Sequence, residues 1–223
     1  MESVLEFYKS KTNEGIRIIQ ANSFVDVFKK HFNFDYITCV ETGSSSNNYD
    51  NFGLMLGKIC DEKNGDLISV DINQEYVEQS KLFYHSEFPS LKVSHQVGDS
   101  VSFLEGYFGK ANLYHFDSMD LDLLNPLPAM LHGWLEFSAI KDKAPSGTLC
   151  FFDDNWLRDT WIETKIYVDG IKTEQIVRTD ITYEIIGKGG LVYHWIKQRE
   201  TDWELVGEHY NVGDNIKIAI RKK

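Results

Sequence analysis

Short apolar runs alternate with longer amphipathic segments through the first two-thirds of the chain. Runs rich in Val, Ile, Leu, Phe and Tyr predict strands over residues 36–40, 67–70, 91–95, 111–116 and 148–152. Between them, apolar positions three or four residues apart predict helices over 51–59, 73–84, 100–108 and 126–140. Regular alternation of this kind is typical of a parallel sheet with helices on both faces.

Two of the predicted helical segments have distinct apolar faces. Residues 1–34 predict two helices, and the second has a face made of Phe24, Val27, Phe28 and Phe32. The helix predicted over 126–140 has an apolar face made of Leu127, Met130, Leu131, Trp134 and Leu135. We expect both faces to pack against the sheet.

The pattern changes after residue 155. Two β-rich runs, 162–168 and 171–177, flank Asp169-Gly170, a dipeptide that favours a two-residue hairpin turn. We therefore expect a β-hairpin insertion over residues 157–180, beside the functional site. Further apolar runs predict antiparallel strands over 183–186, 191–196, 203–208 and 216–221.

The predicted fold class is α/β. It is a doubly wound, Rossmann-like, mostly parallel sheet with helices on both faces and an antiparallel C-terminal β addition. We expect a single domain, in which N-terminal helices over 1–34 precede the α/β core over 35–223. A length of 223 residues is sufficient for one such domain with a sizeable core.

The charge and the cysteine content limit the classes of binding partner and the cellular compartment that we expect. The chain has 34 acidic and 23 basic side chains and a net charge of −11, and an acidic surface repels nucleic acids and anionic membranes. The three cysteines, Cys39, Cys60 and Cys150, are widely spaced and favour buried free thiols in a reducing compartment. Residues 1–11 lack an apolar signal core, and no apolar stretch approaches the roughly 20 residues of a membrane span. We expect a cytoplasmic protein without nucleic-acid or membrane partners.

Acidic residues gather at the strand ends, where ligands bind in parallel α/β sheets. Glu41 and Asp71 lie at the ends of the first two predicted strands. Asp99 precedes the helix after the third, and Asp117 and Asp153 follow the fourth and fifth. Each of these residues also suits a helix cap or a turn. Because several carboxylates on one sheet edge repel each other, their joint occurrence predicts a cationic ligand or a metal there.

The loop after the first strand favours a cofactor without phosphates. Gly43 lets the backbone turn sharply and lets a ligand approach. Ser45 stands where a dinucleotide-binding loop has its second glycine, and the lysine of a phosphate-binding loop is missing. A cofactor with a sulfonium and an ammonium suits the acidic edge better than a pyrophosphate does. Asp71, 28 residues after Gly43, is placed to accept hydrogen bonds from the two hydroxyls of a ribose.

Together these residues resemble the class I S-adenosylmethionine-dependent methyltransferases, especially the metal-dependent branch of small-molecule and sugar O-methyltransferases. The resemblance covers residues 35–156 and identifies 35–223 as a methyltransferase domain. It implies that the first loop holds the amino-acid part of S-adenosylmethionine, that Asp71 binds the ribose, and that Asp99 and Ser100 contact the adenine. The serine-rich stretch 44–48 departs from the family, because many members carry a second glycine there. The implied cofactor-binding residues are Glu41, Thr42, Gly43, Ser44, Ser45, Asp71, Ile72, Asp99, Ser100 and Asp117.

The same resemblance implies a divalent cation. In the metal-dependent branch, a carboxylate after strand four and an acidic pair after strand five hold the metal, which corresponds here to Asp117 and the run Asp153, Asp154 and Asn155. Counting from Gly147 favours Asp153 with Asp154, whereas matching an Asp-Asn pair favours Asp154 with Asn155. Oxygen ligands suit Mg²⁺ or Mn²⁺ rather than Zn²⁺. The alternative is that the run only forms a loop and that one acid matters.

The implied reaction is in-line transfer of a methyl group to an acceptor hydroxyl, which the metal would orient and acidify. Two residues are candidates for the catalytic base. Asp120 stands where related enzymes of this branch have a Lys or His, and His132 has Glu136 four residues away on the same helix face. An exposed helical histidine without a role is the alternative for His132. The polar, acidic segment that includes Asp122 and Asn125 favours a small polar acceptor such as a sugar or glycan.

Two other functions compete with this interpretation. One is a nucleotide-dependent oxidoreductase of Rossmann type, which the missing second glycine disfavours. The other is a non-catalytic module that keeps the fold and binds the cofactor. The expected partners are a small-molecule or glycan acceptor and, in a homo-oligomer, further copies of the chain.

Overall fold

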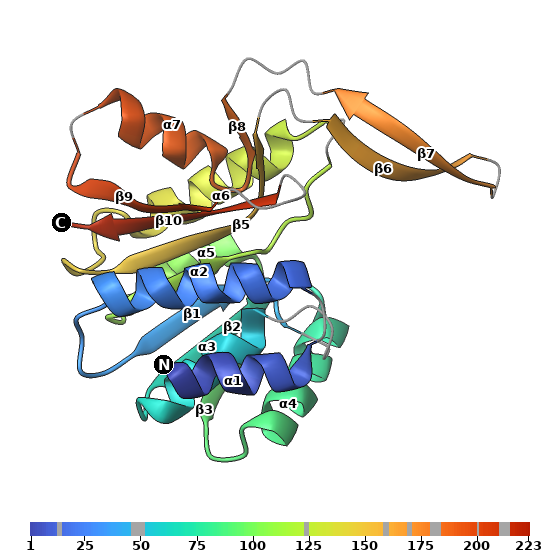
Figure 1. The fold of residues 1–223 in the computed structure, drawn as a ribbon. Coiled ribbons are helices and arrows are strands. Elements are labelled where there is room, and N and C mark those ends of the chain that lie inside the picture. Colours follow the sequence, from blue (N-terminus) through green and yellow to red (C-terminus); the bar gives the residue numbers. More distant parts are fainter. Residues whose placement is uncertain are drawn as a thin grey trace.

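A mixed eight-stranded sheet lies at the centre of the protein (Figure 1). The computed structural model describes residues 1–12, 15–45, 52–122, 125–157, 161–168, 171–178, 184–199, 201–209 and 215–223. The parallel strands are β1 (Thr38–Thr42), β2 (Asp66–Asp71), β3 (Lys92–Val97), β4 (Leu113–Phe116) and β5 (Leu149–Leu157). They lie in the order β3-β2-β1-β4-β5. The five predicted parallel strands are confirmed, and their carboxyl ends share one edge of the sheet.

Antiparallel strands complete the sheet beyond β5. Strand β10 (Asn215–Lys222) pairs with β5 and with β9 (Trp203–His209), and the short β8 (Ile185–Gly187) pairs with the end of β5. The antiparallel C-terminal addition expected from the sequence is therefore present. It covers the edge of β5 that the parallel strands leave free.

A separate two-stranded sheet follows β5. Strands β6 (Trp161–Val168) and β7 (Ile171–Arg178) pair antiparallel from Trp161↔Arg178 to Val168↔Ile171. Figure 1 shows this pair projecting away from the central sheet. The register fits the predicted hairpin, whose Asp169-Gly170 turn lies outside the described residues. That it approaches the functional site stays a prediction.

Helices cover both faces of the sheet. They are α1 (Glu2–Lys11), α2 (Gly15–His31), α3 (Phe52–Glu62), α4 (Gln74–Glu87), α5 (Ser100–Gly106), α6 (Leu127–Ile140) and α7 (Gly190–Gln198). Side chains of α1, α2, α3 and α4 form one hydrophobic core, and those of α5, α6 and α7 form a second core. Successive residues of β5 alternate between the two, because Phe151 lies in the first core and Cys150 and Phe152 lie in the second.

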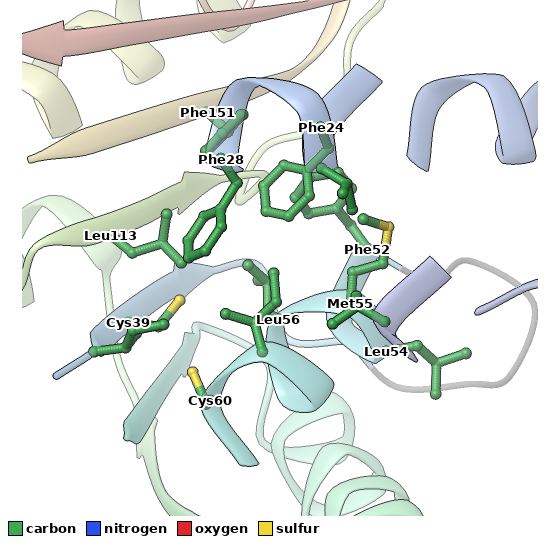
Figure 2. Close-up of a cluster of buried hydrophobic side chains, with 14 of the residues drawn as sticks. Phe24, Phe28, Cys39, Phe52, Leu54, Met55, Leu56, Cys60, Leu113 and Phe151 are labelled. Atoms are coloured by element: carbon green, nitrogen blue, oxygen red, sulfur yellow. The ribbon is translucent and has the colours of Figure 1, made fainter. Parts of the chain in front are cut away.

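The first core contains the apolar face predicted for α2. Phe24, Val27, Phe28 and Phe32 are all buried there. Figure 2 shows Phe24 and Phe28 of α2 beside Leu56 of α3 and Phe151 of β5. The three cysteines are free and buried, as expected. None of the helices in the described ranges combines the length and the apolar character that a bilayer crossing requires.

One predicted strand is a helix in the structure, and one predicted helix face is buried only in part. Residues 191–196 form most of helix α7 rather than a strand. Val192, Trp195 and Ile196 recur at helical spacing and pack into the second core, so they fit a helix as well as a short apolar run. On α6, the face with Leu127, Leu131 and Leu135 is about half exposed, at 46%, 46% and 50%. Met130 and Trp134 of the predicted face do pack inward, and the buried side of α6 continues through Phe137 and Ile140.

Strand β5 is longer than predicted. It runs through Asp153, Asp154 and Asn155, which the sequence placed in the loop after the strand. Asp154 nevertheless has a positive φ of 48°, so the strand is distorted at that residue. Asn155 is paired on both sides, with Ile216 of β10 and Gly187 of β8, so the sheet fixes its position.

Candidate active site

Gly43 shapes the turn at the end of β1. Its φ is +81°, and its N–H donates a hydrogen bond to the carbonyl of Val70 at 2.9 Å. A Cβ at this position would lie 2.6 Å from the carbonyl carbon of Asp117 and closer still to its oxygen. Only glycine satisfies both the backbone conformation and this close approach. The turn therefore holds the ends of β1, β2 and β4 together.

Glu41 lies beneath this turn and is fully buried. Its carboxylate accepts hydrogen bonds from Ser69 Oγ at 2.7 Å, Tyr84 OH at 2.9 Å and Ser45 Oγ at 3.2 Å. Burial raises the pKa of Glu41, and the bonds from Ser69 and Tyr84 offset only part of that rise. Thr42 is also fully buried. The side chains of both residues support the loop from below, and the sequence reasoning missed Ser69 and Tyr84 as partners of Glu41.

A pocket of about 350 Å³ opens beside the turn, at the ends of β2 and β4 and the N-terminus of α5. Six residues predicted from the sequence share its wall, namely Asp71, Ile72, Asp99, Ser100, Asp120 and His132. Val70, Ser118 and Met119 complete the lining. Residues up to 62 positions apart in the sequence thus meet in one cavity because the ends of parallel strands share an edge.

Asp71 bridges the first loop and the start of α4. One carboxylate oxygen accepts the N–H of Ser44 at 2.8 Å, and the other accepts the N–H of Asn73 at 2.7 Å. Each oxygen has a second lone pair, so the carboxylate can still accept hydrogen bonds from a ligand. Ser44 Oγ in turn lies 2.8 Å from Ser69 Oγ, which connects this carboxylate to the Glu41 network.

Asp99 caps a helix and also lines the pocket. It is the N-cap of α5 and accepts the N–H of Ser102 at 2.8 Å. That hydrogen bond lowers the pKa of Asp99, so the carboxylate is anionic. Asp99 also lines the pocket. A helix cap and a ligand-facing carboxylate are therefore the same side chain.

His132 projects from α6 into the pocket within a polar network. Its Nε2 lies 3.0 Å from Ser100 Oγ and 3.6 Å from Glu136 Oε1, and Ser118 Oγ donates to that same oxygen at 2.7 Å. Hydrogen bonding to the buried Glu136 raises the pKa of His132, although burial acts in the opposite direction. Asp120 lies on the same wall and is exposed. Both predicted base candidates thus face the pocket.

The carboxylates predicted to hold a metal surround a lysine. Lys188 comes from the turn between β8 and α7, and only 3% of its side chain is exposed. Its Nζ contacts Asp117 Oδ1 and lies 2.8 Å from Asp154 Oδ2. Burial alone lowers the pKa of Lys188, but the carboxylates of Asp117, Asp154 and Asp153 outweigh it and raise the pKa above the ordinary value. Lys188 is therefore a charged ammonium.

The predicted oxygen ligands fit Mg²⁺ or Mn²⁺ poorly. Asp117 and Asp154 already have a cationic partner in Lys188. The Asn155 amide donates to the carbonyls of Phe152 and Asp153 at 3.0 Å, and its oxygen accepts the N–H of Gly189 at 2.7 Å. In both proposed registers, Asp153 with Asp154 or Asp154 with Asn155, each residue has at least one side-chain oxygen already engaged by a protein donor. Lys188 thus offsets part of the negative charge of this edge from within the chain.

The glycines that flank Lys188 in the sequence are the local signal of its close approach to β5. Residues 187–190 read Gly-Lys-Gly-Gly. Gly187 has a φ of +113°, and a Cβ there would lie 2.7 Å from Asn155 Cα. The glycine thus lets the turn press against β5, which brings the Lys188 side chain to the carboxylates.

Comparisons with known proteins extend these observations. No protein-family model and no curated protein matches the sequence. Among solved structures, the glycopeptide N-methyltransferase MtfA, determined with S-adenosylmethionine, is similar at a TM-score of 0.52 and 9% identity, over 90% of this chain and 93% of MtfA. A Clostridium thermocellum protein provisionally described as an rRNA methylase gives 0.57 and 10%, over 91% of this chain and 97% of its own.

A third similar structure was also determined with a cofactor product. SMU.1697c of Streptococcus mutans, provisionally described as a methyltransferase and solved in complex with S-adenosylhomocysteine, has a TM-score of 0.53 and 8% identity. The match covers 92% of this chain and 97% of SMU.1697c. At such low identities the shared property is the fold. The chain has the Rossmann-like fold of the class I S-adenosylmethionine-dependent methyltransferases.

Proposed function

We propose that the protein is an S-adenosylmethionine-dependent methyltransferase that acts on a hydroxyl of a small polar acceptor such as a sugar or glycan. The observation that carries the proposal is the pocket in which Asp71, Asp99 and His132 meet. It lies where the α/β sheet architecture places ligands, at the carboxyl ends of the parallel strands. Similar folds in MtfA and SMU.1697c were solved with S-adenosylmethionine and S-adenosylhomocysteine.

The pocket walls suit the parts of this cofactor. Asp71 has free lone pairs for the two ribose hydroxyls, and the Asp99–Ser100 pair offers a carboxylate and a hydroxyl for adenine. The acidic lining favours a cofactor with a sulfonium and an ammonium. A dinucleotide is less suited, because the loop sequence after Gly43 has neither the second glycine nor the lysine that a pyrophosphate-binding loop uses. This argues against the oxidoreductase alternative.

In this proposal S-adenosylmethionine supplies an electrophilic methyl group, which passes to the acceptor oxygen as the bond to sulfur breaks. His132, whose Nε2 lies 3.0 Å from Ser100 Oγ, takes the proton that the acceptor hydroxyl loses. Glu136 stabilises the imidazolium that results, and Ser118 holds Glu136 in place. The pocket walls orient the acceptor in line with the methyl group, which supplies much of the acceleration.

Asp120 is the alternative base. It is an exposed carboxylate on the pocket wall. A carboxylate is in general a weaker base at neutral pH than an imidazole, and Glu136 raises the pKa of the His132 imidazole further. For this reason we assign the proton transfer to His132 and an acceptor-binding role to Asp120.

Glu136→Gln is expected to move the pH dependence of kcat to lower pH. The base works as neutral imidazole, and hydrogen bonding to Glu136 raises the pKa of His132. Removal of the carboxylate charge therefore lowers that pKa, and the rising limb of the pH–rate profile shifts in the acid direction. The measurement is a pH–rate profile of both proteins, with Glu78→Gln on the exposed face of α4 as the matched control. A limb that stays in place in Glu136→Gln but moves in Asp120→Asn would assign the base to Asp120.

Methyl transfer itself is tested with S-adenosylmethionine that carries a deuterated methyl group. The protein is incubated with a panel of sugars and catechols, and products are analysed by mass spectrometry for the label on oxygen. We expect labelled sugar products and no labelled catechols. Intact S-adenosylhomocysteine binding without turnover on any acceptor would instead favour the non-catalytic binding module.

A further inference from the structure

The charged cluster at the ends of β4 and β5 contains its own cation. Asp117 follows β4, Asp153 and Asp154 lie on β5, and Lys188 reaches them from the β8–α7 turn. The lysine is buried and touches two of the three carboxylates. An ammonium in this position offsets part of the negative charge that would otherwise favour an external cation.

The turn that carries Lys188 is itself fixed to β5. The N–H of Gly189 donates to Asn155 Oδ1 at 2.7 Å, and strand β8 pairs with β5 at Asn155↔Gly187. The lysine therefore approaches from a rigid support rather than from a mobile loop. A divalent cation that entered the cluster would meet this ammonium at close range, and like charges at that distance repel strongly in a partly buried site.

We propose that Lys188 takes the place of a divalent metal, so that this chain excludes Mg²⁺ and Mn²⁺ and uses the lysine to position Asp117 and Asp154. The role in catalysis rests on the proposed methyltransferase function, whereas the exclusion of metal does not. The position of Asp117 also affects the loop after β1, which we propose binds the cofactor. The carbonyl of Asp117 is the group against which Gly43 packs, so the end of β4 sets the shape of the first loop.

The described residues also show where a metal would bind once Lys188 is removed. Ligand atoms of His115, Asp117 and Asp153 lie within 4.8 Å of one another. The His115 ring stacks on Phe52 with 4.4 Å between ring centroids, which holds it in place. In the native chain Lys188 engages Asp117 Oδ1 and brings a positive charge next to this group. Loss of the ammonium frees Asp117 and Asp154 together.

The test compares Mn²⁺ binding to the full chain and to Lys188→Met, which keeps an unbranched side chain one atom shorter and removes its charge. Binding is followed by the electron paramagnetic resonance signal of free Mn²⁺ and by thermal unfolding with MnCl₂ or EDTA. For the native chain we expect no binding at millimolar Mn²⁺ and an unchanged Tm in EDTA. Lys188→Met is expected to bind Mn²⁺ at least tenfold more tightly and to rise in Tm when Mn²⁺ is added.

Controls separate the specific effect from a general change in charge. Lys81→Met removes an exposed lysine of α4 and should leave Mn²⁺ binding unchanged. Asp117→Asn combined with Lys188→Met should abolish the gain. Mn²⁺ binding to the native chain that Asp117→Asn removes would overturn the proposal, and so would a folded Lys188→Met variant without any gain. If that variant fails to fold, the native-chain measurement still decides. A failed methyl-transfer assay leaves these binding results unaffected, so the two proposals fail separately.

Discussion

Gly43→Ala is expected to abolish S-adenosylhomocysteine binding and to destabilise the fold. The φ of +81° costs a residue with a Cβ about 1–2 kcal/mol. The new Cβ would also meet the Asp117 backbone at well under van der Waals distance, and relief of such overpacking typically costs about 1–3 kcal/mol more. The free energy of unfolding should therefore fall by about 2–5 kcal/mol. Displacement of the loop separates Ser44 from Asp71, and the pocket loses its shape.

The measurements for Gly43→Ala are urea denaturation and calorimetric titration with S-adenosylhomocysteine. Gly106→Ala is the matched control, because a Cβ at Gly106 meets no atom within 4 Å. It should change the free energy of unfolding by no more than about 0.5 kcal/mol, as surface substitutions usually do. Cofactor affinity within threefold of the native value in Gly43→Ala would show that the turn does not shape the binding site.

Asp71→Asn is expected to weaken S-adenosylhomocysteine binding by about 10- to 100-fold. The carboxylate accepts the N–H groups of Ser44 and Asn73, one on each oxygen, and in our proposal also two ribose hydroxyls. An amide has one acceptor oxygen, so its NH₂ group must face one of these donors. Hydrogen bonds to a charged group contribute about 1.5–3 kcal/mol each, which gives the expected loss.

Calorimetric titration of native protein and Asp71→Asn measures this loss. Asp142→Asn is the control, since Asp142 is an exposed carboxylate in the turn after α6, outside the pocket. It should bind the cofactor like the native chain. Equal affinities in Asp71→Asn and Asp142→Asn would mean that the ribose is held elsewhere.

The parallel part of the fold was predictable because its signals are local. Each strand from β1 to β5 and each helix between them has its own apolar pattern, and the sheet edge follows from the alternation. The pocket residues Asp71, Asp99 and Ser100 were found for the same reason, since each stands directly at a strand end or a helix start. Their place next to a strand end or a helix start was sufficient to predict that they lie at one edge of the sheet.

The rest depends on contacts between distant parts of the chain. Lys188 pairs with Asp117 across 71 residues, and Tyr84 bonds to Glu41 across 43 residues. No periodicity in the sequence encodes such pairs. Helix α7 was mistaken for a strand because a short apolar run fits both periods. On α6 two apolar faces compete, and only packing against α5 and α7 decides that Phe137 is buried and Leu131 is not.

We propose above all that the pocket between Asp71, Asp99 and His132 binds S-adenosylmethionine. Calorimetric titration of the native protein with S-adenosylhomocysteine and, separately, with NAD⁺ tests it most directly. We predict saturable one-to-one binding of S-adenosylhomocysteine, weakened in Asp71→Asn, and no heat of binding with NAD⁺. Binding of NAD⁺ without binding of S-adenosylhomocysteine would contradict the account.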